Sequence, residues 1–162
     1  RLCANGLHLD LRWEGASLYD GVGRPFMTRW SIAPLPGAAE WVRSLHEEEW
    51  RQAIASSAPR LNVEVMYEAM GFRGLIDTLV AAEDVTEGKP DPEVFLRAAH
   101  RLAVPPDRCV VVEDAEAGIE AARRGGMYSV GVGGGAVGAA HLVVASLDEL
   151  PPDVFDRLIR RG

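Results

Sequence analysis

The feature that most constrains the fold is a short apolar run that stops abruptly at two acids. Residues 109–112 read Cys-Val-Val-Val, and Glu113 and Asp114 follow directly. An uninterrupted run of this length is typical of a parallel strand buried on both faces, because a half-exposed strand would alternate with polar residues. In open α/β sheets, ligands bind outside the carboxyl ends of the strands. The sequence therefore predicts a functional site at Glu113 and Asp114, whose carboxylates suit a hard cation.

The rest of the chain alternates short apolar runs with amphipathic stretches. We expect further strands at 51–55, 76–82, 128–132 and 141–145, and helices at 38–48, 59–70, 92–104 and 117–124. Asp91 is the expected N-cap of the third helix, with Pro92 as its first residue. Strands that alternate with helices predict an α/β fold with a doubly wound parallel sheet. A chain of 162 residues fits a single core.

The first third of the chain shows a different pattern. Residues 7–13 read Leu-His-Leu-Asp-Leu-Arg-Trp, and this strict alternation is typical of a strand with one dry and one wet face. Residues 17–19 supply a second short strand after a turn, which completes a β-hairpin. We therefore divide the chain into an irregular N-terminal segment with this hairpin, residues 1–32, and an α/β core, residues 33–162.

Composition narrows the class of partner. The formal net charge of −7 argues against a general binder of nucleic acid or of anionic membranes. No apolar run approaches the roughly 20 residues that a membrane-spanning helix needs. The 2 cysteines give no disulfide framework, which favours a reducing cytoplasm. We expect a small-molecule partner, with no nucleic acid and no membrane, and leave assembly into a homo-oligomer open.

Three separated segments together resemble one family. Residues 54–57, 88–92 and 111–119 are similar, in order and in approximate spacing, to the second, third and fourth motifs of the haloacid dehalogenase superfamily. The branch they resemble is that of the β-phosphoglucomutase-like and phosphoglycolate-phosphatase-like enzymes. Each motif alone is a weak signal, but three in order with matching strand and helix contexts are specific. The resemblance covers about residues 33–150 and implies a Rossmann-like core.

The resemblance assigns the phosphate-binding and catalytic residues. Ser56 looks like the hydroxyl that hydrogen-bonds the transferring phosphoryl group, and a strand-end serine with neighbouring backbone N–H groups is a good anion cradle. Ser57, beside it in the phosphate loop, is expected to make the local capping bond. Lys89 resembles the lysine that neutralises the phosphate and orients the nucleophile. The alternative for the two serines is an ordinary turn, and for Lys89 a solvated loop position.

The resemblance also implies a metal. Asp114 is similar to the magnesium ligand of the fourth motif, with Glu113 beside it as a second ligand or as an acid behind the first shell of ligands. The alternative is that both acids cap a helix N-terminus. The implied activity is that of a magnesium-dependent hydrolase or phosphomutase, and the implied partner is a small phosphorylated metabolite.

The sequence departs from the family at its first motif. That motif, Asp-x-Asp-Gly, supplies the nucleophile and the general acid/base, and its nearest counterpart is the segment 9–15. There Asp10 could stand for the nucleophile, and the alternative, which the alternation of 7–13 favours, is a surface residue of an amphipathic strand. Arg12 occupies the second acidic position and stays protonated at any working pH. The helical cap domain of this branch is also absent, because only 20 residues separate Gly15 from Pro36.

Two hypotheses follow from this departure. The first is a truncated or degenerate enzyme of this family with little or no turnover on its own. The second is a non-catalytic relative that binds a phosphate metabolite or a protein partner through the same pocket.

The family's first strand lies at the centre of its sheet, and residues 7–13 are our candidate for that position.

Overall fold

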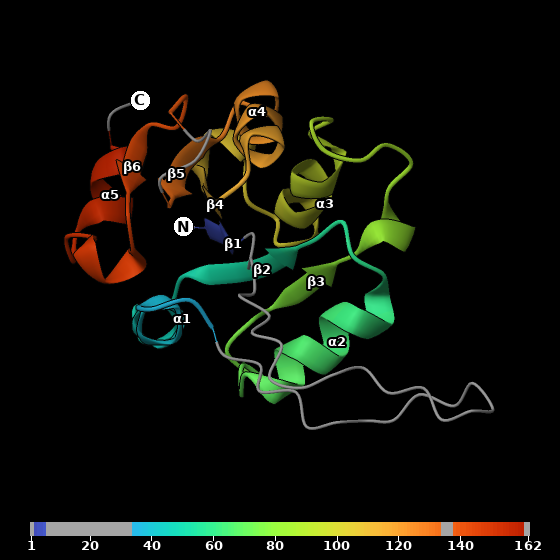
Figure 1. Ribbon diagram of the computed structural model, residues 1–162, viewed down its shortest axis with the longest axis horizontal. Coiled ribbons are helices and arrows are strands. Elements are labelled where there is room, and N and C mark those ends of the chain that lie inside the picture. Colours follow the sequence, from blue (N-terminus) through green and yellow to red (C-terminus); the bar gives the residue numbers. More distant parts are fainter. Residues whose placement is uncertain (1, 6–33, 134–137, 161–162) are drawn as a thin grey trace, which may run out of the picture.

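A computed structural model describes residues 2–5, 34–133 and 138–160. Its centre is one six-stranded sheet in the order β3-β2-β1-β4-β5-β6, and every neighbouring pair is parallel (Figure 1). The strands are β1 (Leu2–Asn5), β2 (Arg51–Ala55), β3 (Thr78–Val80), β4 (Cys109–Glu113), β5 (Tyr128–Val132) and β6 (Leu142–Val144). The expected doubly wound parallel sheet is confirmed.

Helices cover both faces of this sheet. They are α1 (Ala38–Glu47), α2 (Arg60–Ala69), α3 (Glu93–Arg101), α4 (Glu116–Arg124) and α5 (Val154–Ile159), with short 3₁₀ turns at Ala82–Asp84, Pro106–Arg108 and Leu147–Glu149. Helices α3 and α4 bury their apolar stripes on one face, while α1, α2 and α5 cover the other. The strands and helices predicted between residues 38 and 145 agree with these elements to within a few residues at their ends.

Strand β4 is dry on both faces, as its sequence predicts. Cys109 and Val111 pack under α3 and α4, while Val110 and Val112 pack on the α1 and α5 side. All five residues of the strand are buried, including the terminal Glu113. The position of this acid at the end of a dry strand is what brings a carboxylate to the edge of the sheet.

Burial gives the Cys109 thiol an expected chemical signature. Desolvation raises the pKa of Cys109 to about 12, and the thiolate is the reactive form of the side chain. We therefore expect iodoacetamide at mildly alkaline pH to leave Cys109 unmodified in the folded protein and to alkylate it in denaturant, as read by peptide mass spectrometry. Alkylation of Cys109 at similar rates in both conditions would contradict the buried position.

The centre of the sheet corrects one expectation. The slot predicted for residues 7–13 is filled by β1, which pairs in parallel with β2 and β4. The apolar sequence of residues 2–4 is too short for a periodicity to be recognised. A strand between two buried parallel strands is nevertheless expected to be apolar throughout, and not alternating like residues 7–13. Residues 2–5 thus share a sheet with the core. The expected hairpin and the boundary after residue 32 fall in 6–33, outside the described residues.

The carboxyl-terminal helix α5 was not predicted. Its apolar residues Val154, Phe155 and Leu158 are buried against the α1 side of the sheet. Phe155 makes edge contacts with Trp41 and Trp50, with ring centroids 5.0 and 6.0 Å apart. These tryptophans therefore belong to the core.

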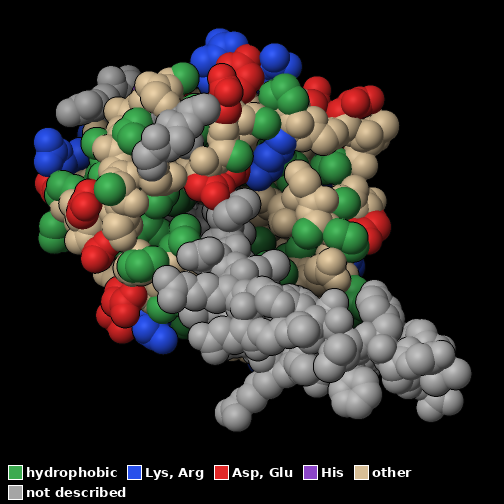
Figure 2. Space-filling model, viewed as in Figure 1, with side chains coloured by type: hydrophobic (Ala, Val, Ile, Leu, Met, Phe, Trp, Pro, Cys, Tyr) green, Lys and Arg blue, Asp and Glu red, His purple; other side chains and the backbone are tan. Residues whose placement is uncertain are grey.

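The surface mixes charges of both signs. In the view of Figure 2, acidic and basic side chains are interspersed over the part of the face where residues are described. None of the described helices combines the length and the apolar character that crossing a bilayer requires.

Candidate functional site

The site lies where β2, β1 and β4 end side by side. Asn5, the last residue of β1, is in register with Ile54 on one side and with Val112 on the other. The next residues along the two flanking strands are Ala55 and Glu113, which end β2 and β4. Because all three strands are parallel, their carboxyl ends form one edge, the usual location of a ligand site in this type of sheet.

Lys89 spans this edge from the loop before α3. Its Nζ lies 2.7 Å from Oε2 of Glu113 and 3.4 Å from the carbonyl oxygen of Ala55. The ammonium also lies 4.7 Å from the centroid of the Phe95 ring, within the range of a cation–π contact. The Lys89 and Glu113 side chains are 14% and 6% exposed. Lys89, the only lysine in the sequence, is therefore held between the ends of two strands, not solvated in a loop.

Glu113 uses both of its carboxylate oxygens within the protein. Oε2 accepts the bond from Lys89, and Oε1 lies 3.3 Å from the backbone nitrogens of Asp114 and Ala115. Asp114 follows at the turn into α4 and is half-buried. Within the described residues, no group of three or more His, Cys, Asp or Glu side chains gathers as a ready-made metal site. The metal role of Glu113 and Asp114 stays a prediction.

Ser56 begins the turn after β2. Its backbone N–H donates to the Val80 carbonyl at 2.9 Å, and its Oγ accepts from the Ala58 N–H at 3.1 Å. The turn bond to the Ala58 N–H is thus made by Ser56, whereas we expected the local capping bond from Ser57, which is exposed. A hydroxyl that accepts one bond still has its hydrogen to donate, and Ser56 keeps this capacity at the edge of the sheet.

The loop that carries Lys89 is stabilised by acids on either side of Pro92. The Asp91 carboxylate accepts from the Glu93 N–H at 2.9 Å and so holds the first turn of α3. The N-cap itself is Pro92 and the helix begins at Glu93, one residue later than expected for both. Glu93 reaches back and accepts from the N–H groups of Thr86 and Glu87 at 2.7 and 3.0 Å. These hydrogen bonds hold the loop of residues 86–93, which contains Lys89, against the start of α3.

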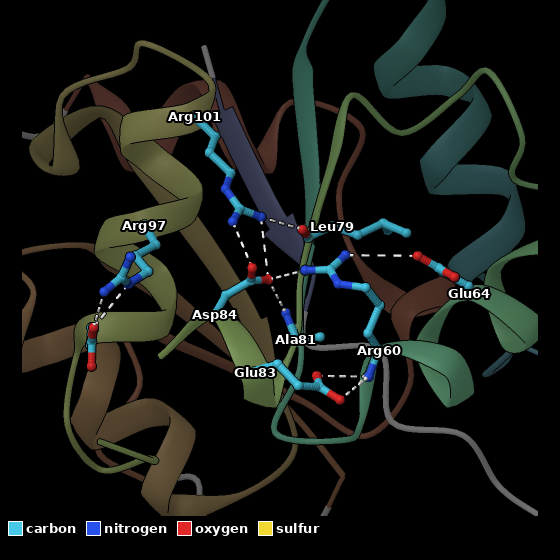
Figure 3. A network of polar contacts seen from close by, with 9 residues as sticks. Arg60, Glu64, Leu79, Ala81, Glu83, Asp84, Arg97 and Arg101 are labelled. Carbon is cyan, nitrogen blue, oxygen red and sulfur yellow. Dashed lines mark hydrogen bonds and ion pairs between the residues drawn. The ribbon is translucent and has the colours of Figure 1, made fainter. Parts of the chain in front are cut away.

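A second polar cluster, which the sequence did not reveal, gathers around Asp84 between Arg60 and Arg101 (Figure 3). Asp84 accepts hydrogen bonds from the Arg60 guanidinium, from Arg101 at 2.8 Å and from the Ala81 N–H at 2.8 Å. Glu83 accepts from the backbone N–H of Arg60 at 2.8 Å and so caps α2, which has no side-chain cap of its own. The cluster joins the start of α2, the turn after β3 and the end of α3.

The cluster stabilises the ionised form of the Asp84 carboxyl. Hydrogen bonding to Arg101 is the main cause that holds the pKa of Asp84 well below its usual range, and the Ala81 N–H and Arg60 act in the same direction. From sequence, residues 83–84 could only be identified as an acidic loop. The arginine partners of Asp84 are distant in the sequence: Arg60 is 24 residues away and Arg101 is 17 residues away.

The fold and the site together define a class of protein. A lysine ammonium, a serine turn and a carboxylate lie at the carboxyl edge of a parallel α/β sheet. An ammonium and a hydroxyl are groups that can bind a phosphoryl group, and a carboxylate is a group that can hold a metal ion. The sequence model of haloacid dehalogenase-like hydrolases matches residues 9–126. The chain therefore belongs to the haloacid dehalogenase-like hydrolase family.

Comparisons with individual proteins agree with this assignment. The chain is 41% identical over 118 residues to 5-amino-6-(5-phospho-D-ribitylamino)uracil phosphatase of Arabidopsis thaliana, a match that covers 70% of this chain and 32% of that protein. It is 37% identical over 117 residues to the β-phosphoglucomutase of Bacillus subtilis, covering 72% of this chain and 51% of the relative. The resemblance to the β-phosphoglucomutase-like and phosphatase-like branch is confirmed.

A solved structure of the same kind shares the fold. The crystal structure of CbbY from Rhodobacter sphaeroides in complex with phosphate is similar with a TM-score of 0.73 at 29% identity, covering 78% of this chain and 60% of that chain. The present chain thus spans about a third to a half of the length of the two curated relatives.

Proposed function

We propose that the sheet edge at Ser56, Lys89 and Asp114 binds the phosphate group of a small phosphate ester together with magnesium. In this proposal the chain forms the core of a phosphatase or phosphomutase. The observation that carries the proposal is the position of Lys89, whose ammonium is held between the ends of β2 and β4. The named relatives, a phosphatase and a phosphomutase, support this class of substrate.

Each residue has a definite task in phosphoryl transfer. The Lys89 ammonium neutralises negative charge on the phosphoryl oxygens, and the Ser56 hydroxyl donates a hydrogen bond to one of them. Glu113 keeps the ammonium at the edge before the ester arrives, because it accepts a 2.7 Å bond from Nζ. The ester then meets a cation that is already in position, which lowers the entropic cost of assembling the site.

The donor set fits magnesium in one particular way. Magnesium usually keeps several waters and binds through one or two carboxylates plus the phosphate of its substrate. Both Glu113 oxygens already accept bonds within the protein, so we assign Asp114 as the direct ligand and Glu113 as the acid behind it. When bound, the ion would supply further charge neutralisation at the phosphoryl oxygens. Phosphatases of this superfamily generally use a divalent metal ion.

A binding experiment tests the proposal. Titration calorimetry with inorganic phosphate should show binding that strengthens when magnesium is added. Asp114→Asn is expected to weaken the magnesium-dependent part at least about tenfold, because it removes the charged ligand. Glu116→Gln is the matched control, since it removes one exposed acid from the first turn of the same helix. Unchanged magnesium-dependent binding in Asp114→Asn would assign Asp114 to capping and overturn the metal site.

Turnover separates the active enzyme from the binding-only relative. Hydrolysis of p-nitrophenyl phosphate and of sugar phosphates should be measured with magnesium for the unaltered chain and for Asp10→Asn. Asp10 lies outside the described residues and is the sequence's candidate for the nucleophile. Turnover lost in Asp10→Asn would assign the nucleophile to Asp10. Phosphate binding without turnover would instead favour the non-catalytic alternative.

A further inference from the structure

Gly118, in the first half of α4, lies directly against the side chain of Glu113. A Cβ atom built on Gly118 would come within 2.2 Å of Cγ, Cδ and Oε2 of Glu113. Such distances are far inside van der Waals contact, which is about 3.5 Å or more between carbon atoms. Any larger residue at position 118 would therefore require a shift of one of the two groups.

The group that would shift is the Glu113 carboxyl. The three atoms nearest to the added Cβ all belong to the Glu113 side chain and none to the backbone. A side chain can change rotamer at modest cost, whereas α4 is anchored by its buried residues Ile119, Ala121 and Ala122. One of the three atoms, Oε2, is also the acceptor of the Lys89 bond. A substitution at Gly118 would thus act first on the Lys89–Glu113 ion pair.

Backbone conformation does not account for this glycine. Gly118 is absent from the described glycines with positive φ, which are Gly37, Gly71, Gly74, Gly126 and Gly133. It lies inside a regular helix, where glycine is unfavourable relative to alanine because it loses more conformational freedom on folding. Glycine is needed at position 118 because the Glu113 carboxyl occupies the space that a Cβ would take.

We propose that Gly118 is a positioning residue for Lys89 and that it acts through Glu113. The absence of a Cβ lets the Glu113 carboxylate reach between α4 and the Lys89 loop, where it accepts the ammonium bond. The importance of this device for phosphate binding rests on the function proposed above, while the device itself concerns only the protein's own groups. The proposal predicts that the effect of a substitution at Gly118 depends on the presence of the Glu113 side chain. It also predicts that the environment of the Lys89 side chain changes with that substitution.

The single lysine gives a direct readout. Selective carbon-13 labelling of lysine should yield one ε-methylene signal in the NMR spectrum, that of Lys89. Its shift depends on the nearby Phe95 ring, whose centroid lies 4.7 Å from Nζ. We expect Gly118→Ala to move this signal in the direction produced by Glu113→Ala, which removes the carboxyl outright. Gly138→Ala is the control, because a Cβ there meets nothing within 4 Å and position 138 is not next to Lys89 in the chain.

The double variant decides whether Gly118 acts through Glu113. In Glu113→Ala the atoms that collide with a Cβ at position 118 are gone, so adding Gly118→Ala should cause no further movement of the Lys89 signal. The proposal is overturned if Gly118→Ala leaves the signal of the unaltered protein unchanged. It is also overturned if Gly118→Ala moves the signal equally in both backgrounds, because the effect would then pass through the helix backbone.

The design also covers a variant that does not fold. If Gly118→Ala is unfolded and the double variant with Glu113→Ala is folded, the rescue supports the coupling. If Glu113→Ala is folded but the double variant is not, the proposal fails. These measurements need neither phosphate nor magnesium, so their outcome is separate from that of the phosphate titration that tests the proposed function.

Discussion

Replacing Lys89 with methionine is expected to lower the free energy of unfolding by about 3 kcal/mol. The substitution leaves the Glu113 carboxylate, whose side chain is 6% exposed, without its cation, and removing one partner of a buried ion pair typically costs 3–5 kcal/mol. We take the lower end because Lys89 is 14% exposed, so water partly screens the pair. Urea unfolding followed by circular dichroism measures the change. The same variant should abolish phosphate binding, since the neutralising ammonium is gone.

Two companion variants identify the cause of the Lys89→Met effect. Arg73→Met breaks the ion pair between Arg73 and Glu68, in which the two side chains are 76% and 56% exposed. This change should alter the free energy of unfolding by no more than about 1 kcal/mol. Adding Glu113→Gln to Lys89→Met removes the uncompensated charge and should recover much of the loss. Equal effects of Lys89→Met and Arg73→Met would show that the Lys89–Glu113 pair is not buried as described.

Asp84→Ala is expected to be similarly destabilising, by about 3 kcal/mol at neutral pH. The carboxylate, whose side chain is 15% exposed, accepts bonds from Arg60, Arg101 and the Ala81 N–H, and each hydrogen bond to a charged group is worth about 1.5–3 kcal/mol. The loss falls short of their sum because both guanidiniums are more than a third exposed and regain water. Urea unfolding again measures the effect.

Glu120→Ala is the matched control for Asp84→Ala. Glu120 also receives two arginines, Arg123 and Arg124, but all three lie on one helix, both arginines are exposed, and the Glu120 side chain is 30% exposed against 15% for Asp84. Exposed pairs of this kind contribute well under about 1 kcal/mol. If Glu120→Ala lowered the free energy of unfolding as much as Asp84→Ala, the contacts that Asp84 makes between separate segments would contribute nothing to stability.

The pH dependence of the Asp84 effect has a definite sign. Arg101 and the other donors lower the pKa of Asp84 in the folded state, so the folded protein holds the ionised form more strongly than the unfolded chain, in which the pKa is about 3.9. The stabilisation is therefore complete above the unfolded pKa and is lost as the pH falls through the folded pKa. The difference in stability between the unaltered protein and Asp84→Ala should shrink as the pH is lowered from neutral to about pH 3. A constant difference over this range would contradict the lowered pKa.

The Asp84 cluster has a consequence for the site itself. Arg60 starts α2 only three residues after Ser57, and both its backbone N–H and its guanidinium are held by the Glu83–Asp84 turn. The turn in which Ser56 lies is therefore tied to the segment that leads on to Lys89. Loosening this tie would reduce the preorganisation on which phosphate binding depends.

Local patterns in the sequence determined most of the secondary structure. The dry strand at 109–112, the strand at 51–55 and the amphipathic helices could be predicted because periodicity and helix-end signals are written in neighbouring residues. The order of the second, third and fourth motifs pointed to the family and to Lys89, Glu113 and Asp114. The sheet edge as the place where these residues meet followed from the parallel topology.

Only the tertiary structure decided which groups pair at that edge and what fills the centre of the sheet. The Lys89–Glu113 bond joins residues 24 positions apart, and the space for it depends on Gly118, a contact across the turn from β4 into α4. The Asp84 cluster likewise joins the ends of two helices. Strand β1 was missed because four residues carry too little pattern, and its place is set by hydrogen bonding to β2 and β4. Local preference specifies an element, whereas pairing between distant elements is specified by how their buried faces fit together.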